Sequence, residues 1–302
     1  MNTLERKIDF AVIISVTDAN PNGDPLNDNR PRENSEGLGE MSDVCIKRKI
    51  RNRLQDMGER IFVQSDDRCD DGCDSLRTRA EKCEELKKIS ALKSPTKSDS
   101  DKFAEIACST WIDVRSFGQV FAFKGKKKDS DGEDSKQKGV SVGVRGPVSI
   151  GIAKSVSPID IISMQIVKSV NGEPASGKAP DTMGTKKRVE FGLYVFKGSI
   201  NCQLAEKTGF TEEDAEKIKQ ALATLFENDC SAARPDGSMQ VCRVYWWKHD
   251  CKYPSISSAK VHNSLKITEK AGLGRRPHSF EDYDIVLEKI EGLAEPEIFV
   301  DM

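Results

Sequence analysis

The order of apolar and polar residues along the chain predicts alternating strands and helices. An apolar run at about residues 6–17 is typical of a strand, and a turn rich in Asn, Pro and Gly at residues 18–25 ends it. Apolar residues at helical intervals then predict a helix over about residues 43–58, with Ser42 as a suitable N-cap. The apolar positions of this helix are Ile46, Ile50, Leu54 and Met57.

The next part of the chain has the character of an insertion. Residues 65–100 are rich in Asp, Lys, Ser and Cys, and they contain too few apolar residues for a core of their own, so we expect them on the outside. Within them, residues 76–89 predict a short helix. Residues 102–123 have a helical apolar period that Gly118 interrupts. The charged, Gly-containing tract at residues 124–138 is typical of a disordered loop.

Extended segments return in the second half of the chain. They are predicted at residues 140–148, 158–167 and 189–202. The last two are separated by a loop of about eighteen residues, 170–188, which contains several Gly and Pro residues. A structureless loop of that length is uncommon in a compact domain and is usually functional.

One more helix and one more strand complete the pattern. The segment Thr211–Asp214 resembles a capping box and opens a helix with one apolar face, and residues 240–247 read as a strand. The order is therefore strand, helix, a large insertion, two strands joined by a long loop, helix and strand. This is βαββαβ with additions, the order of an α+β domain of the RRM or ferredoxin-like type, with an antiparallel sheet.

Length and charge limit the classes of function. A chain of 302 residues can bury a real core in one large domain or two smaller ones. Its 37% of hydrophobic and 32% of charged residues describe a soluble globular protein. The formal net charge of −2 argues against a protein that coats nucleic acid indiscriminately. Any positive charge that serves binding must be concentrated locally.

The sequence gives little indication of a membrane span, a secretion signal or a metal site. No apolar run approaches the roughly 18 to 20 residues that span a bilayer, and residues 1–7 lack the apolar core of a secretion signal, so we expect a cytoplasmic protein. Nine cysteines are irregularly spaced without a CxxC pair, and the three histidines are dispersed. We therefore expect reduced thiols and no metal site.

Local positive charge is concentrated in the predicted helix at residues 43–58. Five of the seven residues from Lys47 to Arg53 are cationic. Lys47 and Arg51 are four apart and share a flank, where their charges are at roughly phosphate spacing. Asn20 and Asn22 in the preceding turn can donate hydrogen bonds. The loop and helix together predict a site that holds a phosphate backbone, and the alternative is the solvated face of an ordinary amphipathic helix.

Four short motifs resemble one known family when they are taken in order. They are residues 20–25, 42–51, 113–118 and 188–194. Together they resemble the backbone subunit of type I CRISPR Cascade, the "Cas seven" family, with the greatest similarity to subtype I-C. The resemblance runs from the first strand to about residue 290.

This resemblance implies one RRM-like palm domain over residues 1–302 that carries insertions. Residues 59–112 would form helical fingers, and residues 170–188 a long thumb loop or hairpin. The family role is non-catalytic and needs no cofactor: copies assemble head to tail along a CRISPR RNA (crRNA), which pairs with the target DNA strand in prokaryotic antiviral defence. Other implied partners are a crRNA-processing "Cas five"-type subunit and a large subunit. The aromatic motifs of an ordinary RRM are absent, so base stacking on the sheet is not expected.

The resemblance also extends the set of candidate RNA-binding residues beyond the basic helix. Backbone contacts suit a protein that must accept any guide sequence. Met183 is the candidate for an apolar wedge between bases. The full set is Asn20, Asn22, Lys47, Arg48, Arg51, Arg115, Arg145, Met183, Lys186, Lys187 and Arg188.

The main rival is a metal site, or a metal-dependent ribonuclease, built on the acidic loop Asp18–Asp28. Asp18, Asn20, Asn22 and Gly23 match the first, third, fifth and sixth positions of an EF-hand loop. The twelfth position is Asn29 instead of a bidentate Glu, and a strand precedes the loop. The simpler interpretation is a turn in which Asx side chains bond their own backbone.

A nuclease would also need clustered carboxylates or a histidine base. Asp24, Asp28, Asp113 and His249 are the available residues, but no spacing favours them. A third class is an assembly protein whose basic helix contacts an acidic partner subunit. The segment from Ser255 to Pro277 has no assigned role.

Overall fold

An antiparallel sheet forms the centre of the molecule. The computed structural model describes residues 2–92, 95–123, 141–170 and 183–300. Within these residues, the main sheet has the order β14-β11-β1-β10-β8-β4, and β7 and β9 also pair with β10. The strands are β1 (Ile8–Ala19), β4 (Leu38–Met41), β7 (Val148–Ile150), β8 (Ala153–Pro158), β9 (Ile161–Val167), β10 (Met183–Ile200), β11 (Met239–Lys248) and β14 (Glu297–Val300). The predicted α+β class with a large antiparallel sheet is confirmed.

Strand β1 is central, and both of its faces are buried. It pairs with β10 from Ile8↔Ile200 to Ala19↔Val189 and with β11 on its other side. Because successive side chains point to opposite faces, Phe10 and Val12 lie in one core while Ala11 and Ile13 lie in another. This explains why its sequence is an almost continuous apolar run.

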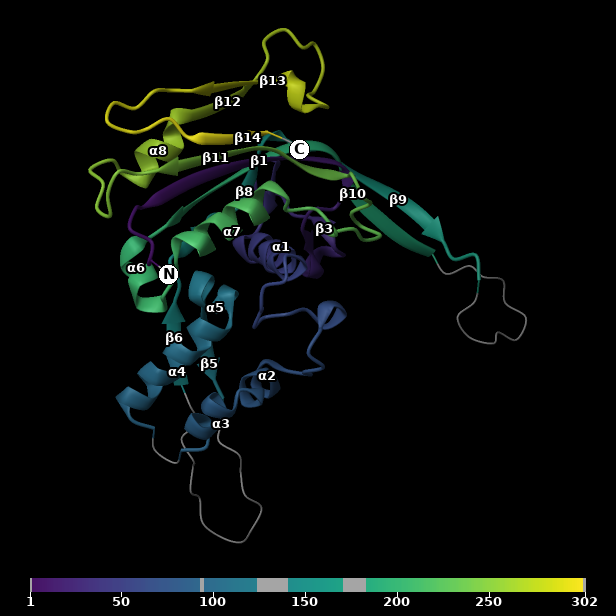
Figure 1. The fold of residues 1–302 in the computed structure, drawn as a ribbon. Coiled ribbons are helices and arrows are strands. Elements are labelled where there is room, and N and C mark those ends of the chain that lie inside the picture. The colour runs from purple at the N-terminus through teal and green to yellow at the C-terminus, as the bar shows by residue number, and fades with distance from the viewer. Residues whose placement is uncertain (1, 93–94, 124–140, 171–182, 301–302) are drawn as a thin grey trace.

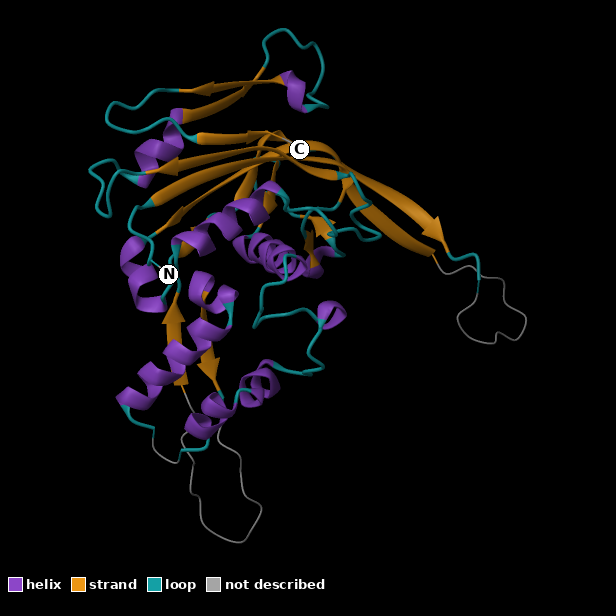
Figure 2. Cartoon of the chain, in the orientation of Figure 1, coloured by secondary structure: helices purple, strands orange, loops and turns teal. Residues whose placement is uncertain are grey.

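Each face of the sheet has its own cover (Figures 1 and 2). Helices α1 (Asp43–Asp56) and α7 (Glu212–Ala223) pack on one face, with α6 (Cys202–Thr208) nearby. On the other face lie α8 (Ser258–Ser264), η3 (Phe280–Asp282) and the hairpin of β12 (Leu265–Glu269) with β13 (Tyr283–Leu287). The segment that had no assigned role in the sequence, Ser255–Pro277, thus contributes to this second layer.

Two predicted helix starts are confirmed in atomic detail. The Ser42 hydroxyl accepts a hydrogen bond from Cys45 N at 3.2 Å and caps α1. Thr211 and Asp214 form the reciprocal capping box of α7. Because caps depend on residues three apart, they can be read from sequence alone.

The region between α1 and β7 forms a separate body beneath the sheet (Figure 1). Its elements are η2 (Asp66–Arg68), α2 (Leu76–Lys82), α3 (Glu84–Ser90), α4 (Lys97–Thr110), α5 (Ile112–Phe117) and the ribbon of β5 (Gly118–Ala122) with β6 (Ser141–Arg145). The single helix predicted at residues 76–89 is wrong, because the chain breaks at Cys83 into two helices. The helical period after residue 102 ends at Phe117, and Gly118 begins a strand.

The expectation that residues 65–100 lack a core is also corrected. Ala80 and Leu86 are fully buried in a second hydrophobic cluster with Phe62, Phe103 and Phe121. The partners come from both sides of the segment, and one comes from β5. The segment has too few apolar residues alone, but it shares a core with its neighbours in space.

The predicted loop at residues 170–188 is partly a strand. Residues 183–188 begin β10 and pair with β9, from Met183↔Val167 to Val189↔Ile161. This hairpin, β9–β10, projects from the sheet on the side away from α6 (Figure 1). The rest of the predicted thumb, residues 171–182, lies outside the described residues, as does the tract at residues 124–138. No helix in the described ranges is long and apolar enough to cross a membrane.

Candidate nucleic-acid interface

The Asn/Pro/Gly loop after β1 is held to the start of α1 by asparagine side chains. It contains the short elements β2 (Gly23–Asp24), η1 (Pro25–Asn27) and β3 (Arg30–Pro31). Asn20 is buried, and its Nδ2 donates to the carbonyl of Asn29 at 2.7 Å. The Oδ1 of Asn22 accepts from Ser42 N at 2.9 Å. Both side chains therefore shape the loop, and the Asn20 Oδ1 has no hydrogen-bond partner in the described part of the chain.

Arg51, on α1, binds a buried carboxylate. Its Nε donates to Asp113 Oδ2 at 2.9 Å, and its guanidinium lies over the Phe117 ring, 5.0 Å from the centroid. Asp113 is fully buried and also accepts from the backbone N–H groups of Phe62 and Val63. The pair joins α1 to α5.

The other two residues of α1 that the sequence predicts as RNA ligands also have partners within the protein. Lys47 pairs with Asp43 one turn earlier at 3.0 Å, and Arg48 donates to the carbonyl of Val63 at 2.6 Å. Burial lowers the pKa of the Arg48 guanidinium. Lys47 and Arg51, the two cations expected to share a flank of the helix, thus each have a carboxylate partner in this structure.

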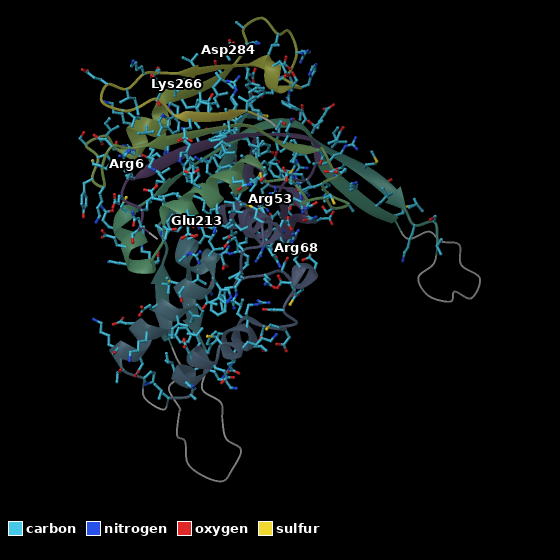
Figure 3. All side chains as sticks on the ribbon, viewed as in Figure 1. Arg6, Arg53, Arg68, Glu213, Lys266 and Asp284 are labelled. Atoms are coloured by element: carbon cyan, nitrogen blue, oxygen red, sulfur yellow. The ribbon has the colours of Figure 1, made fainter. Side chains whose placement is uncertain are left out.

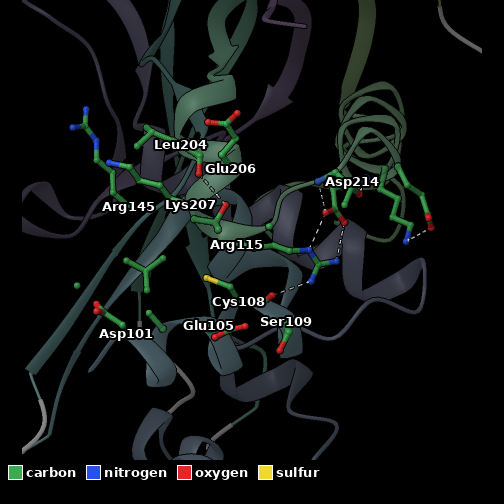
Figure 4. Close-up of a pocket in the computed structure, with 18 residues that line it drawn as sticks. Asp101, Glu105, Cys108, Ser109, Arg115, Arg145, Leu204, Glu206, Lys207 and Asp214 are labelled. Atoms are coloured by element: carbon green, nitrogen blue, oxygen red, sulfur yellow. Dashed lines mark hydrogen bonds and ion pairs between the residues drawn. The ribbon is translucent and has the colours of Figure 1, made fainter. Parts of the chain in front are cut away.

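Arg115 and Arg145 belong to a different part of the surface (Figure 4). Both line a groove of about 1130 Å³ between α4, β6, α6 and α7. Arg115 makes hydrogen bonds of 2.9 and 2.7 Å to the two carboxylate oxygens of Asp214, the capping residue of α7. Arg145 has no carboxylate partner in the described ranges. The groove also contains acidic residues, including Asp101 and Glu105, so its charge is mixed.

Three cations and three aspartates meet where β10 leaves the sheet. Arg188 lies 3.0 Å from Asp18, Lys187 lies 3.0 Å from Asp28, and Arg32 lies 3.3 Å from Asp24. We call these six residues the capped basic cluster. It connects the loop at residues 18–32 to the root of the β9–β10 hairpin, and the same loop contacts the start of α1.

The cations of this cluster retain unused hydrogen-bond donors. The Nε atoms of Arg32 and Arg188 are both buried, and neither makes an aligned hydrogen bond within the described residues. The Arg188–Asp18 contact is thus an ion pair by distance and not an aligned hydrogen bond. Lys186, next along β10, has no carboxylate partner in the same ranges. Arg32 was missed by sequence reasoning, although it lies in the same loop as Asn20 and Asn22.

The register of the hairpin places cations and apolar side chains on both of its faces. Cross-strand pairs share a face, so Met164 and Ile166 lie on the face of Lys186 and Arg188. Met183 lies on the other face with Val167, and its side chain is 70% exposed. Both faces therefore expose apolar side chains, a combination that suits contact with bases or with another protein.

The residues of the rival interpretations do not meet in one place. Asp24 and Asp28 hold cations, Asp113 is buried beneath α1, and His249 Nε2 lies 2.7 Å from Asp9 Oδ2 at the far end of β1. In the described ranges, no group of three or more His, Cys, Asp or Glu side chains is placed to hold a metal ion. None of the nine cysteines, all of which lie in the described ranges, forms a disulfide.

Comparisons with known proteins agree on one family. A family profile described as "CRISPR-associated protein Cas7" matches residues 6–288. A protein named "CRISPR-associated protein Cas7" from Haloferax volcanii is 29% identical over 224 residues, which are 72% of this chain and 63% of that protein. The chain thus spans less than two thirds of that relative's length.

Two solved structures are also similar to this chain. A chain of a "CRISPR RNA-guided surveillance complex, pre-nicking" has a TM-score of 0.49 at 15% identity, with 84% of this chain and 81% of that chain covered. A chain of a "CRISPR RNA-guided surveillance complex" has a TM-score of 0.45 at 14% identity, covering 83% and 72%. The family profile covers most of the chain, and on that match the protein belongs to the Cas7 family of CRISPR-associated proteins.

Proposed function

We propose that this chain is a non-catalytic, RNA-binding backbone subunit of a type I CRISPR surveillance complex of subtype I-C. Several copies would assemble head to tail along one crRNA and hold it for pairing with foreign DNA. Membership of the Cas7 family supports the assignment to such a complex. The observation that carries the RNA-binding role is the gathering of four cations at the hairpin root, Arg32, Lys186, Lys187 and Arg188, of which three are paired with aspartates that an RNA phosphate could replace.

We assign the palm to the RRM or ferredoxin-like class. The antiparallel order β11-β1-β10-β8, with α1 and α7 on one face, supports this assignment because it follows the βαββαβ sequence of elements. In an ordinary RRM the free sheet face stacks bases. Here α8, β12 and β13 cover that face, so RNA would have to bind at the loop, at α1 and at the hairpin instead. On this assignment residues 59–112 are the main part of the fingers and the β9–β10 hairpin is the thumb.

Binding at the capped basic cluster would use the RNA backbone. Phosphate contacts position a strand without reading its sequence, which is what a holder of many different guides requires. The guanidinium groups of Arg32 and Arg188, whose side chains are 41% and 29% exposed, are suitable partners for phosphate oxygens. Lys186 and Lys187 add charge, and Met183 is exposed as the proposed wedge between bases requires.

RNA binding by Arg51 and Arg115 stays a prediction. Each guanidinium would have to leave a buried carboxylate, Asp113 or Asp214, to contact a phosphate. Lys47, Arg48 and Arg145 remain candidates on the edge of the same surface or in the groove. The proposed partners are the crRNA, the paired target DNA strand, further copies of this chain, a "Cas five"-type subunit and a large subunit.

The test is RNA binding across a salt series, with two unrelated single-stranded sequences. We expect similar affinity for both sequences and a steep loss with salt. The variant Lys186→Ala/Lys187→Ala should bind more weakly, with a salt slope smaller by about 0.7 for each lost phosphate contact. Lys266→Ala is the matched control, because Lys266 is exposed on β12 on the opposite side of the sheet (Figure 3).

Three outcomes contradict parts of the proposal. If the wild type does not bind RNA, the RNA-binding role fails. If the Lys266 variant loses as much affinity as the double variant, the hairpin root is not the site. Cleavage of the RNA that a chelator stops would show a metal-dependent ribonuclease instead of a binding subunit.

A further inference from the structure

Two of the three ion pairs in the capped basic cluster place the carboxylate on the solvent side. Asp28 is 76% exposed while Lys187 is 17% exposed, and Asp18 is 56% exposed while Arg188 is 29% exposed. A ligand that approaches from solvent therefore meets the carboxylates before the cations. Asp24 differs, because it is less exposed than Arg32 and its Oδ1 also caps η1 through Leu26 N.

The two exposed aspartates reach opposite faces of the same strand. Lys187 and Arg188 are consecutive in β10, so their side chains point to opposite faces of the hairpin. Asp18 and Asp28 lie at the two ends of the loop, and both have left-handed backbone angles, with φ of 53° and 49°. The loop therefore neutralises the root of the hairpin from both faces at once.

These pairs are weak enough to exchange. Exposed ion pairs contribute little because water screens them and because long side chains lose entropy when they are fixed. The Asp18 carboxylate lies 3.0 Å from the Arg188 Nε without an aligned hydrogen bond, so the attraction between the two charges alone holds this pair. A phosphate has more acceptor oxygens and can approach from a different direction.

We propose that Asp18 and Asp28 are intramolecular competitors of the RNA phosphates for Arg188 and Lys187. The inference rests on the proposed RNA-binding function and adds a selectivity device to it. A ligand that replaces only one carboxylate leaves the other pair intact and gains little. Because Lys187 and Arg188 point to opposite faces, only an RNA strand that passes around the root of the hairpin replaces both carboxylates, so the loop favours an extended RNA backbone over isolated phosphates.

The test compares Asp18→Asn, Asp28→Asn and the double variant with the wild type, using a fluorescein-labelled single-stranded RNA of mixed sequence. Asn tolerates the left-handed conformation, so the turn is preserved. We expect each single variant to bind about two- to fivefold more tightly, the range that an exposed ion pair corresponds to. Glu36→Gln is the matched control, since Glu36 is exposed in the same part of the chain and has no cation partner in the described ranges.

A double-mutant cycle separates competition from a general change in charge. In an Arg188→Ala background, Asp18→Asn should no longer tighten binding, because the pair that it releases is already absent. If the Asp variants bind no more tightly than Glu36→Gln, or if Asp18→Asn still tightens binding without Arg188, the competitor role is wrong while wild-type RNA binding stands. If neither the wild type nor any variant binds RNA, the proposed function fails and the inference fails with it.

Discussion

The Nε of Arg51 lies 2.9 Å from Oδ2 of Asp113, a carboxylate with no solvent exposure. The two residues are far apart in sequence, on α1 and α5, and Asp113 also accepts two backbone hydrogen bonds from Phe62 and Val63, in the segment that follows α1. This pair fixes α5 and that segment to α1. A residue that the sequence marks as a candidate RNA ligand thus has a structural task in the folded chain.

Replacement of Arg51 should therefore lower stability. Arg51→Ala leaves the Asp113 carboxylate buried without a counter-charge, and removal of one partner of a buried pair costs about 3–5 kcal/mol. Urea unfolding followed by circular dichroism measures the difference in the free energy of unfolding. Lys47→Ala removes an exposed pair of the same helix and should cost less than about 1 kcal/mol. Equal losses for the two variants would contradict the structural role of Arg51.

The junction between α5 and β5 depends on a glycine. Gly118 has φ of 80°, and a Cβ at this position would overlap the backbone carbonyl oxygen of Val144 in the paired strand. We expect Gly118→Ala to lower the free energy of unfolding by more than about 3 kcal/mol, since backbone strain and overlap add. Gly58→Ala is the control: Gly58 has φ of 86° with nothing near the added Cβ, so only the strain of about 1 kcal/mol remains. A similar loss in both variants would show that the overlap relaxes without cost.

Thiol reactivity should divide the cysteines by burial. Burial raises the pKa of the Cys108 thiol to about 11, so at about pH 8 only on the order of one molecule in a thousand carries the thiolate there. Burial also raises the pKa of the Cys202 thiol to about 11, whereas Cys230 and Cys251 are exposed. Iodoacetamide labelling with mass spectrometry should modify the exposed pair in the native protein and Cys108 only after unfolding. Rapid native labelling of Cys108 would contradict the packing of α4.

The free energy of unfolding should fall as the pH drops through the range in which histidine titrates. Burial lowers the pKa of His262 below its usual 6.5, so the folded chain holds this ring neutral. As pH falls through 6.5, His262 is protonated in the unfolded chain before it is protonated in the folded chain. Protonation therefore favours the unfolded state, and the free energy of unfolding decreases. Urea midpoints at about pH 7 and about pH 5 measure the effect.

His262→Gln provides the control for this pH dependence. The His262 Nε2 lies 3.0 Å from the carbonyl of Gly198, and an amide can donate to the same oxygen without titrating. The variant should have a smaller loss between the two pH values than the wild type. An unchanged loss would assign the pH dependence to groups other than His262.

Features that depend on near neighbours in sequence were predictable. The apolar run of β1, the period of α1 and the caps at Ser42 and Thr211 are patterns of two to four residues, and the structure confirms each of them. The start of β10 was missed because Gly184 and three consecutive cations hide its pattern. Those residues become a strand only by pairing with β9.

The sequence by itself determined the elements with strong local patterns, namely β1, α1, α7 and β11, and it showed that cations gather near an Asx-rich loop. Only the tertiary structure decided which cations form ion pairs, and with which carboxylates. Arg51 meets Asp113, Arg115 meets Asp214, and Lys187 meets Asp28 across distances in sequence that no local pattern spans. A helix cap or an apolar period depends on residues within one helix or strand, whereas an ion pair forms wherever the fold brings two charges within a few ångströms. The charge that is available to a ligand is therefore a property of the folded chain.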